Sequence, residues 1–200
     1  SGLAANATQY STASQLAWWT EFSRFRQTVG AFGGGGLHVE AGRDIVNLQA
    51  MVPTAGWADS RLMAEATLQR VGGGDLEVRA GRDLLGGQYF VAAGEGRLSA
   101  GRTLGEAAGN TRIRHTVLAQ MDGADWRISA RDGLTAPGSV NPTALPVSSS
   151  DSRAPVSGYY YTWGDAASVR MTANAGPLTV VGTPAESALV GLGLFGESAS

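Results

Sequence analysis

The chain has 200 residues, of which 43% are apolar and only 16% charged, and it contains 29 glycines, no cysteine and a net charge of −2. This length suits one domain with a sizeable core, and the regular short apolar runs argue against disorder. The absence of cysteine excludes disulfides, thiolate metal sites and cysteine nucleophiles. The arginines are scattered, which argues against nucleic-acid binding. There is no apolar stretch of about 18 residues, which argues against membrane insertion.

The amino-terminal stretch 1–32 is predicted to be a lead-in that contains an amphipathic helix over Ser14–Val29. Ser14 can cap this helix, and Gly30 can end it. Its apolar face would consist of Trp18, Phe22, Phe25 and Val29. We expect this face to cover one side or end of the main domain.

A short segment occurs twice after a run of glycines. Leu37–Ile45 has the sequence Leu-His-Val-Glu-Ala-Gly-Arg-Asp-Ile, and Leu76–Leu84 repeats it with six of the nine positions identical. The glycine runs occupy 33–36 and 72–74. Further copies, in decreasing similarity, cover 97–104, 126–134 and 169–178.

Each copy has the pattern of a strand that buries one face. Leu37, Val39 and Ala41 alternate with polar residues, and the glycine that follows allows a left-handed or tight backbone where the chain turns. One such unit cannot bury its own face, but stacked copies can. We therefore predict that four alanines stack with their side chains inward, namely Ala41, Ala80, Ala100 and Ala130.

The repeat spacing predicts an all-β solenoid over 33–184. The short step from the second copy to the third fits one coil, whereas the step from the first to the second is almost twice as long and fits two coils, with a disguised middle strand in the ambiguous stretch 57–71. The steps to the fourth and fifth copies require longer loops, and the prolines and serines of 135–157 predict one long surface loop. The stretch 185–200 is interpreted as a truncated next coil or a tail. A β-sandwich is the rival fold, but the two-residue hairpin signals that it needs are lacking.

The glycine-preceded repeat resembles those of filamentous-haemagglutinin-like large exoproteins, and the lead-in Trp18-Trp19-x-x-Phe22-x-x-Phe25 is also similar to segments of that family. The resemblance covers roughly 15–180. It implies a right-handed parallel β-helix, export by an outer-membrane two-partner-secretion transporter, and a role in adhesion, biofilm or contact with other cells. The Asn-Pro-Asn motifs of the family's secretion domain are not matched, and Ser1–Tyr10 lacks the features of a signal peptide. We therefore expect an internal fragment of a longer secreted protein.

Few residues suggest chemistry. His38 and His115 lie far apart and are interpreted as solvated rather than metal-binding. The glycine runs lack a phosphate-binding pattern and are interpreted as corners. Asp44, Asp83 and Asp132 recur at equivalent positions, one per repeat, as turn residues do, whereas a catalytic carboxylate is needed once. No catalytic residue, cofactor or metal site is predicted.

The aromatic run at 159–163 is the best candidate for contact with a ligand or partner. Aromatic faces stack on sugar rings and are common at interfaces, although a plain strand explains the run as well. The candidate contact residues are Tyr159, Tyr160, Tyr161 and Trp163.

The repeats predict a structural stalk, and the resemblance implies that it is an adhesive segment of a bacterial exoprotein, secreted or attached to the outer surface of a Gram-negative bacterium. Its expected partner is a receptor or glycan on a host or neighbouring cell. The alternative is a carbohydrate-active β-helix enzyme, a polysaccharide lyase or hydrolase, which would place two or three acids on one open face.

Overall fold

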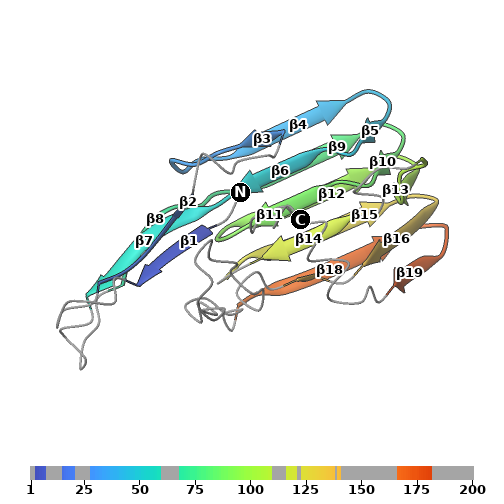
Figure 1. Cartoon of the computed structure of the whole chain (residues 1–200). Coiled ribbons are helices and arrows are strands. Elements are labelled where there is room, and N and C mark those ends of the chain that lie inside the picture. Colours follow the sequence, from blue (N-terminus) through green and yellow to red (C-terminus); the bar gives the residue numbers. More distant parts are fainter. Residues whose placement is uncertain are drawn as a thin grey trace.

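The computed structural model describes residues 3–7, 15–20, 28–59, 68–109, 116–120, 123–137, 139–140 and 166–181. Throughout these residues the regular structure is β-strand, and none of them is helical. The strands form three parallel sheets and one smaller antiparallel sheet (Figure 1). The prediction of an all-β chain dominated by parallel pairing is therefore confirmed, and antiparallel hairpins are not the main pairing.

The three parallel sheets contain five strands each. Sheet 1 consists of β3 (Val29–Gly30), β6 (Gln49–Val52), β11 (Gln88–Val91), β14 (Val117–Gln120) and β17 (Ser139–Val140). Sheet 2 consists of β4 (Leu37–Ala41), β9 (Leu76–Ala80), β12 (Glu95–Ala100), β15 (Asp125–Ala130) and β18 (Ser168–Ala173). Sheet 3 consists of β5 (Ile45–Val46), β10 (Leu84–Leu85), β13 (Thr103–Gly105), β16 (Gly133–Pro137) and β19 (Leu178–Val181).

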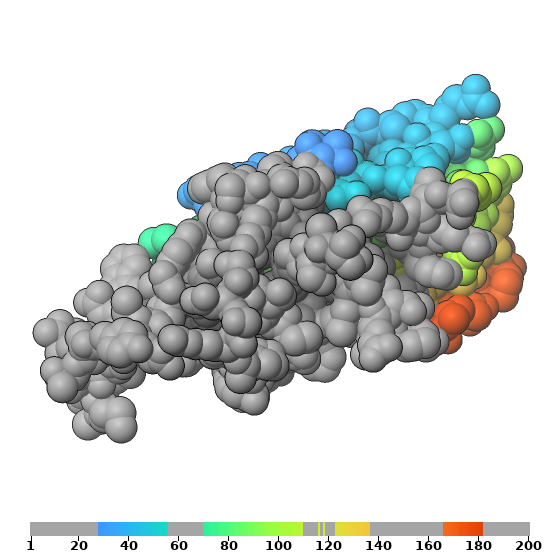
Figure 2. Space-filling model, in the orientation of Figure 1, coloured from blue at the N-terminus to red at the C-terminus, as the bar shows by residue number. Residues whose placement is uncertain are grey.

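The chain visits sheets 1, 2 and 3 in the same order five times, and we call each visit to all three a pass. The first pass is β3, β4 and β5, and the last is β17, β18 and β19. Successive passes lie side by side in sequence order. The blue strands of the first pass therefore form one end of the stack and the orange strands of the last pass the other (Figures 1 and 2).

The long step between the first two repeats covers one pass, so the prediction of two coils with a disguised strand is wrong. Leu37 of β4 pairs directly with Leu76 of β9. The extra residues contain an antiparallel hairpin, β7 (Thr54–Asp59) and β8 (Leu68–Gly72), inserted between β6 and β9. The steps to the fourth and fifth copies are also single passes, because Arg127 pairs with Arg97 and with Arg170.

The lead-in does not form the predicted helix over the part that the structure describes. Residues 15–20 form β2 (Gln15–Thr20), which lies between β1 (Leu3–Ala7) and β7 in the antiparallel sheet. Trp18 pairs with Ala5 on one side and Gly56 on the other. Aromatic residues suit strands, and pairing on both sides of β2 overrides the helical spacing. Phe22 and Phe25 lie outside the described residues.

The predicted loop at 135–157 is wrong at its start. Residues 135–137 belong to β16 and residues 139–140 form β17, the short strand of sheet 1 in the last pass. The serine-rich remainder lies outside the described residues, as does the stretch 185–200.

The core consists of columns of inward side chains that stack from pass to pass. The predicted alanine column is confirmed and includes a fifth member, since the register aligns Ala41, Ala80, Ala100, Ala130 and Ala173. A second column of sheet 2 contains Val39, Val78, Leu98, Ile128 and Met171. The column of sheet 3 contains Ile45, Leu84, Leu104, Leu134 and Leu178. The inner passes are buried almost completely. In the two end passes the column residues of sheet 2 are only partly buried, and Leu178 at the end of the sheet 3 column is exposed.

One column combines the smallest and the largest residue. Gly96 of β12 pairs with Trp126 of β15, whose ring is fully buried. A Cβ atom on Gly96 would lie 2.3 Å from Cε3 of Trp126. The indole therefore occupies the volume that a side chain at position 96 would need.

Candidate functional site: an aspartate–arginine ladder

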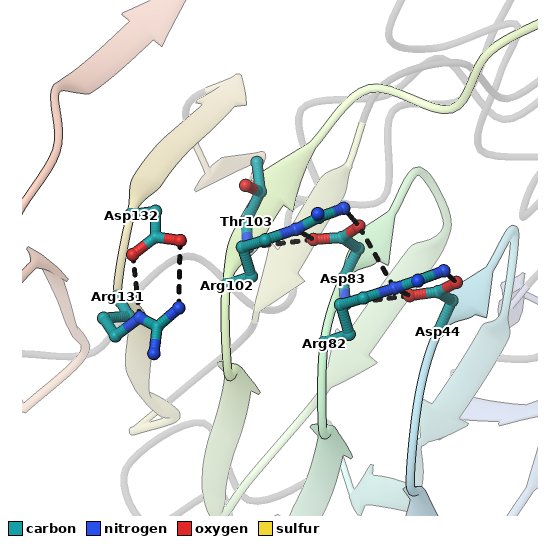
Figure 3. A network of polar contacts seen from close by, with 7 residues as sticks. All are labelled: Asp44, Arg82, Asp83, Arg102, Thr103, Arg131 and Asp132. Carbon is teal, nitrogen blue, oxygen red and sulfur yellow. Dashed lines mark hydrogen bonds and ion pairs between the residues drawn. The ribbon is translucent and has the colours of Figure 1, made fainter.

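A ladder of charged side chains follows the alanine column, at the corner where sheet 2 leads into sheet 3. It is built from the Gly-Arg-Asp sequence that ends each of the first two repeats and from Gly101-Arg102-Thr103 in the third. Figure 3 shows the alternation of aspartate and arginine across three neighbouring passes, in the order Asp44, Arg82, Asp83 and Arg102.

Close backbone contact at this corner requires glycine. A Cβ atom on Gly81 would lie 2.3 Å from the carbonyl oxygen of Gly42, and one on Gly101 would lie 2.1 Å from that of Gly81. None of these three glycines has a positive φ. Of the two predicted possibilities, a left-handed or a tight backbone, the left-handed one is not found, and Gly81 and Gly101 let one pass approach the next closely.

Each arginine binds the aspartate of the preceding pass. Nε of Arg82 donates to Oδ1 of Asp44 at 2.6 Å, and Nη2 of Arg82 donates to Oδ2. Arg102 binds Asp83 in the same two-pronged way, with Nε 2.8 Å from Oδ1. Such paired contacts fix the geometry of both side chains.

Backbone amides complete the carboxylate contacts. The N–H of Asp83 donates to Oδ1 of Asp44 at 3.2 Å, and the N–H of Thr103 donates to Oδ1 of Asp83 at the same distance. Asp83 also lies 3.8 Å from Nε of Arg82, so it has a cation on either side. Only 8% of its side chain is exposed, against 28% for Asp44.

These contacts lower the pKa values of both carboxyl groups. The hydrogen bonds from Arg82 lower the pKa of Asp44 from 3.8 to about 2, with a smaller opposing effect of burial. The hydrogen bonds from Arg102 likewise lower the pKa of Asp83. Both groups are therefore charged near neutral pH, and neither is poised to donate or accept a proton there.

Asp132 does not occupy the position of the other two aspartates. It lies in the column of the arginines, because its N–H donates to the carbonyl oxygen of Arg102. Its carboxylate accepts from Arg131 of its own pass, with Nε 2.8 Å from Oδ1, and this lowers its pKa. The prediction that Asp44, Asp83 and Asp132 are equivalent is thus right for the first two and wrong for the third.

A second charged region lies on the outer face of sheet 2. Arg127 reaches Glu95 at 3.3 Å and Asp125 at 3.4 Å, and Arg97 contacts Glu95 at 2.7 Å. His38 lies at one end, with Nδ1 3.2 Å from Glu77 and Nε2 3.5 Å from Glu40. This face is a network of exposed polar contacts, and exposed ion pairs of this kind contribute little to stability.

Metal-binding clusters are absent from the residues that the structure describes, where no three histidines or acids converge on one point. The described part of the chain also contains no helix long and apolar enough to cross a membrane. His115 and the four aromatic candidates Tyr159, Tyr160, Tyr161 and Trp163 lie outside the described residues.

The glycine runs form corners. Positive φ angles occur at Gly34 and Gly35 in the first run and at Gly72, Gly73 and Gly74 in the second. A Cβ on Gly74 would lie 2.2 Å from the carbonyl oxygen of Gly35, so the two runs also stack closely. This stacking agrees with their interpretation as structural corners.

Sequence reasoning missed the contact between passes. The main partner of Arg82 is Asp44 of the preceding repeat, and Asp83, which follows Arg82 in the chain, lies farther from its guanidinium. The recurrence of Gly-Arg-Asp at the same place in two repeats is the signal that could have revealed it, since stacked repeats bring equivalent residues together. The arrangement cross-links passes and offers no pair of titrating groups for acid–base chemistry.

Comparison with known proteins identifies no relative, because no family model, curated protein or solved structure matches this chain.

Proposed function

We propose that this chain is a segment of a right-handed parallel β-helix that forms a rigid, adhesive stalk in a secreted bacterial surface exoprotein. The single observation that carries the proposal is the repetition of the same contacts from pass to pass. Alanine lies on alanine in every pass, and the arginine–aspartate contact occurs twice in the same geometry. Repetition of this kind builds length and stiffness rather than one localised site.

The dimensions of the stack suit a fibre. Neighbouring strands lie about 4.8 Å apart, so each further pass lengthens the stack by that amount at constant cross-section. The right-handed sense follows the strong general preference of connections between parallel strands in one sheet. Insertions such as the β7–β8 hairpin lengthen the outer surface without interrupting the stack.

The ladder supports a structural role. A bidentate contact between consecutive passes opposes sliding of one pass along the next, because a shift by one residue would separate Arg102 from Asp83. Within the described residues, several outward acids contact arginine, as Glu95 does with both Arg97 and Arg127, whereas Glu77 contacts His38. This pairing gives no support to a catalytic pair of carboxylates.

The proposed partner is a receptor or glycan on a host or neighbouring cell, with Tyr159, Tyr160, Tyr161 and Trp163 as contact residues. The parent protein would reach the cell surface through an outer-membrane two-partner-secretion transporter. These proposals rest on the resemblance of the repeats and on the amphipathic character of aromatic side chains.

An adhesion assay tests this function. Microspheres coated with the purified chain are applied to epithelial and bacterial cell layers, with heat-unfolded chain and a variant carrying Tyr160→Ala and Trp163→Ala as controls. We expect retention by the folded chain and a severalfold loss in the variant. Equal retention of folded and unfolded chain would refute an adhesive role.

A panel of polysaccharides tests the alternative. Reducing-end and unsaturated-product assays should detect no turnover by the wild-type chain. Reproducible turnover that Glu95→Gln abolishes while the circular dichroism spectrum is unchanged would replace the stalk by a carbohydrate-active enzyme.

A further inference from the structure

The arginines of the ladder all bind toward the preceding pass, and within the described residues Arg43 of the first pass has no such carboxylate to bind. Arg82 and Arg102 each bind the aspartate of the pass before their own. Arg43 lies in the same column, since the N–H of Arg82 donates to its carbonyl oxygen at 2.9 Å. No described pass precedes that of Arg43. Among the described residues Arg43 makes no bidentate contact like those of Arg82 and Arg102, although its charge acts on the neighbouring Asp44.

A glycine is present at the same corner without a described neighbour that requires it. Gly81 and Gly101 are needed because the carbonyl of the preceding pass lies against them. A Cβ on Gly42 would meet nothing within 4 Å, and Gly42 does not have a positive φ. Neither the backbone conformation of Gly42 nor any described contact therefore requires glycine there. The lack of a side chain would, however, let the backbone of another pass lie close to it.

The apolar residues of the same strand are incompletely covered. Leu37, Val39 and Ala41 of β4 are only partly buried, whereas their partners Leu76 and Val78 are fully buried. β4 is the outermost strand of sheet 2 (Figure 1), so one side of its backbone lacks a strand among the described residues. Such an edge is a template for a further strand.

We propose that the edge formed by β4 and β5 is a docking surface for one more parallel pass, whose sequence can be inferred from the residues along this edge. The docking segment carries apolar residues above Leu37, Val39 and Ala41, a small residue above Gly42, and a carboxylate that accepts from Arg43. Its sequence therefore follows the pattern of Leu76–Leu84, with aspartate in the column of Asp44. The inference rests on the proposed function in so far as it names the partner of one end of the stalk.

A second copy of this chain, stacked head to tail, does not fit the surface. The last pass has Pro177 in the column of Asp44, because Leu134 pairs with Leu178 and Gly133 precedes Leu134. Proline provides no carboxylate for Arg43. Charge complementarity thus favours a repeat ending in Gly-x-Asp over the chain's own last pass.

Binding of a short peptide tests the proposal. The probe is a fluorescein-labelled peptide with the sequence of residues 75–85, titrated with the full chain and followed by fluorescence anisotropy. The matched control peptide carries Asp83→Asn, and the matched protein variants are Arg43→Gln and Gly42→Val. We expect saturable binding that falls about fivefold or more with either the Asn peptide or the Gln variant, and no further when both are combined.

The Gly42→Val variant should keep its thermal stability and lose peptide binding, because valine blocks close approach of a backbone. Equal affinity of the two peptides, absence of saturable binding, or self-association that excludes the peptide regardless of Arg43 would each overturn the proposal. The titration measures only the edge, so its result does not depend on whether the chain adheres to cells or acts on glycans.

Discussion

The guanidinium of Arg82 binds the carboxylate of Asp44, which lies in the preceding pass and far back in the chain. Arg102 repeats this contact with Asp83. The Gly-Arg-Asp sequence is therefore a connection between passes, and its members differ in how much each should contribute to stability.

Asp83 should contribute more than Asp44. Its side chain is the more deeply buried and lies between two arginines, so Asp83→Asn leaves Arg102 without its carboxylate in a partly dehydrated site. We expect a loss of about 1–2 kcal/mol in the free energy of unfolding for Asp83→Asn. Asp44→Asn should cost less. Urea unfolding of both variants measures the difference, and equal losses would contradict this ranking.

The lowered pKa values predict acid sensitivity. Asp44 has a folded pKa of about 2 against a usual 3.8, so its contribution is present above the unfolded value and is lost as the pH falls. Asp83 shifts in the same direction. We expect the urea midpoint to fall steeply between about pH 4 and pH 2. The double variant Asp44→Asn with Asp83→Asn should show a shallower fall, and an identical pH profile would contradict the ladder's role.

The corner glycines provide a matched pair of substitutions. Gly101→Ala forces a Cβ to within 2.1 Å of the carbonyl oxygen of Gly81, whereas Gly42→Ala places it in open space. We expect Gly101→Ala to lower the free energy of unfolding by about 1–3 kcal/mol, as overpacking does, and Gly42→Ala to leave it nearly unchanged. Thermal melts compare the two directly. Similar losses would indicate that backbone conformation, not close approach, selects glycine here.

The contact between Gly96 and Trp126 should give a clear coupling. Gly96→Ala alone pushes a Cβ into the indole, and Trp126→Leu alone leaves a cavity. In the double variant the smaller leucine makes room for the new methyl group. We expect the double variant to lose less free energy of unfolding than the sum of the two single losses, by about 1 kcal/mol or more. Additive losses in chemical denaturation would contradict direct packing of these two positions.

Much of the stack could be predicted from the repeats. The alternation of Leu37, Val39 and Ala41 identified the buried face, and the common alanine identified the register. Short-range patterns carry this information because each strand must bury the same face in every pass. The parallel pairing followed from the short, coil-length step between Leu76–Ala80 and its copy in β12.

Other features depend on tertiary contacts that the sequence pattern does not contain. The helical spacing of Trp18, Phe22, Phe25 and Val29 was a poor guide, because residues 15–20 gain two strand neighbours in the antiparallel sheet. The insertion of β7 and β8 disguised a single pass as two. The ladder was missed because a chain read residue by residue suggests contacts with neighbours, whereas stacking pairs residues about one pass apart.

A disulfide between β12 and β15 tests the parallel register between passes. Ser99 and Ser129 are paired in the parallel register, and the chain contains no cysteine of its own. Adjacent strands lie about 4.8 Å apart, within the range of Cα separations that a disulfide spans. The double variant Ser99→Cys with Ser129→Cys is oxidised in the folded state, beside Ser99→Cys with Arg127→Cys, which is out of register.

Free thiols are titrated over time in both double variants. We predict rapid and nearly complete loss of free thiol when cysteines replace Ser99 and Ser129, with a higher unfolding temperature after oxidation. The Ser99–Arg127 pair should oxidise much more slowly. Equal rates in the two pairs, or faster oxidation of the second, would contradict parallel, in-register stacking of the passes.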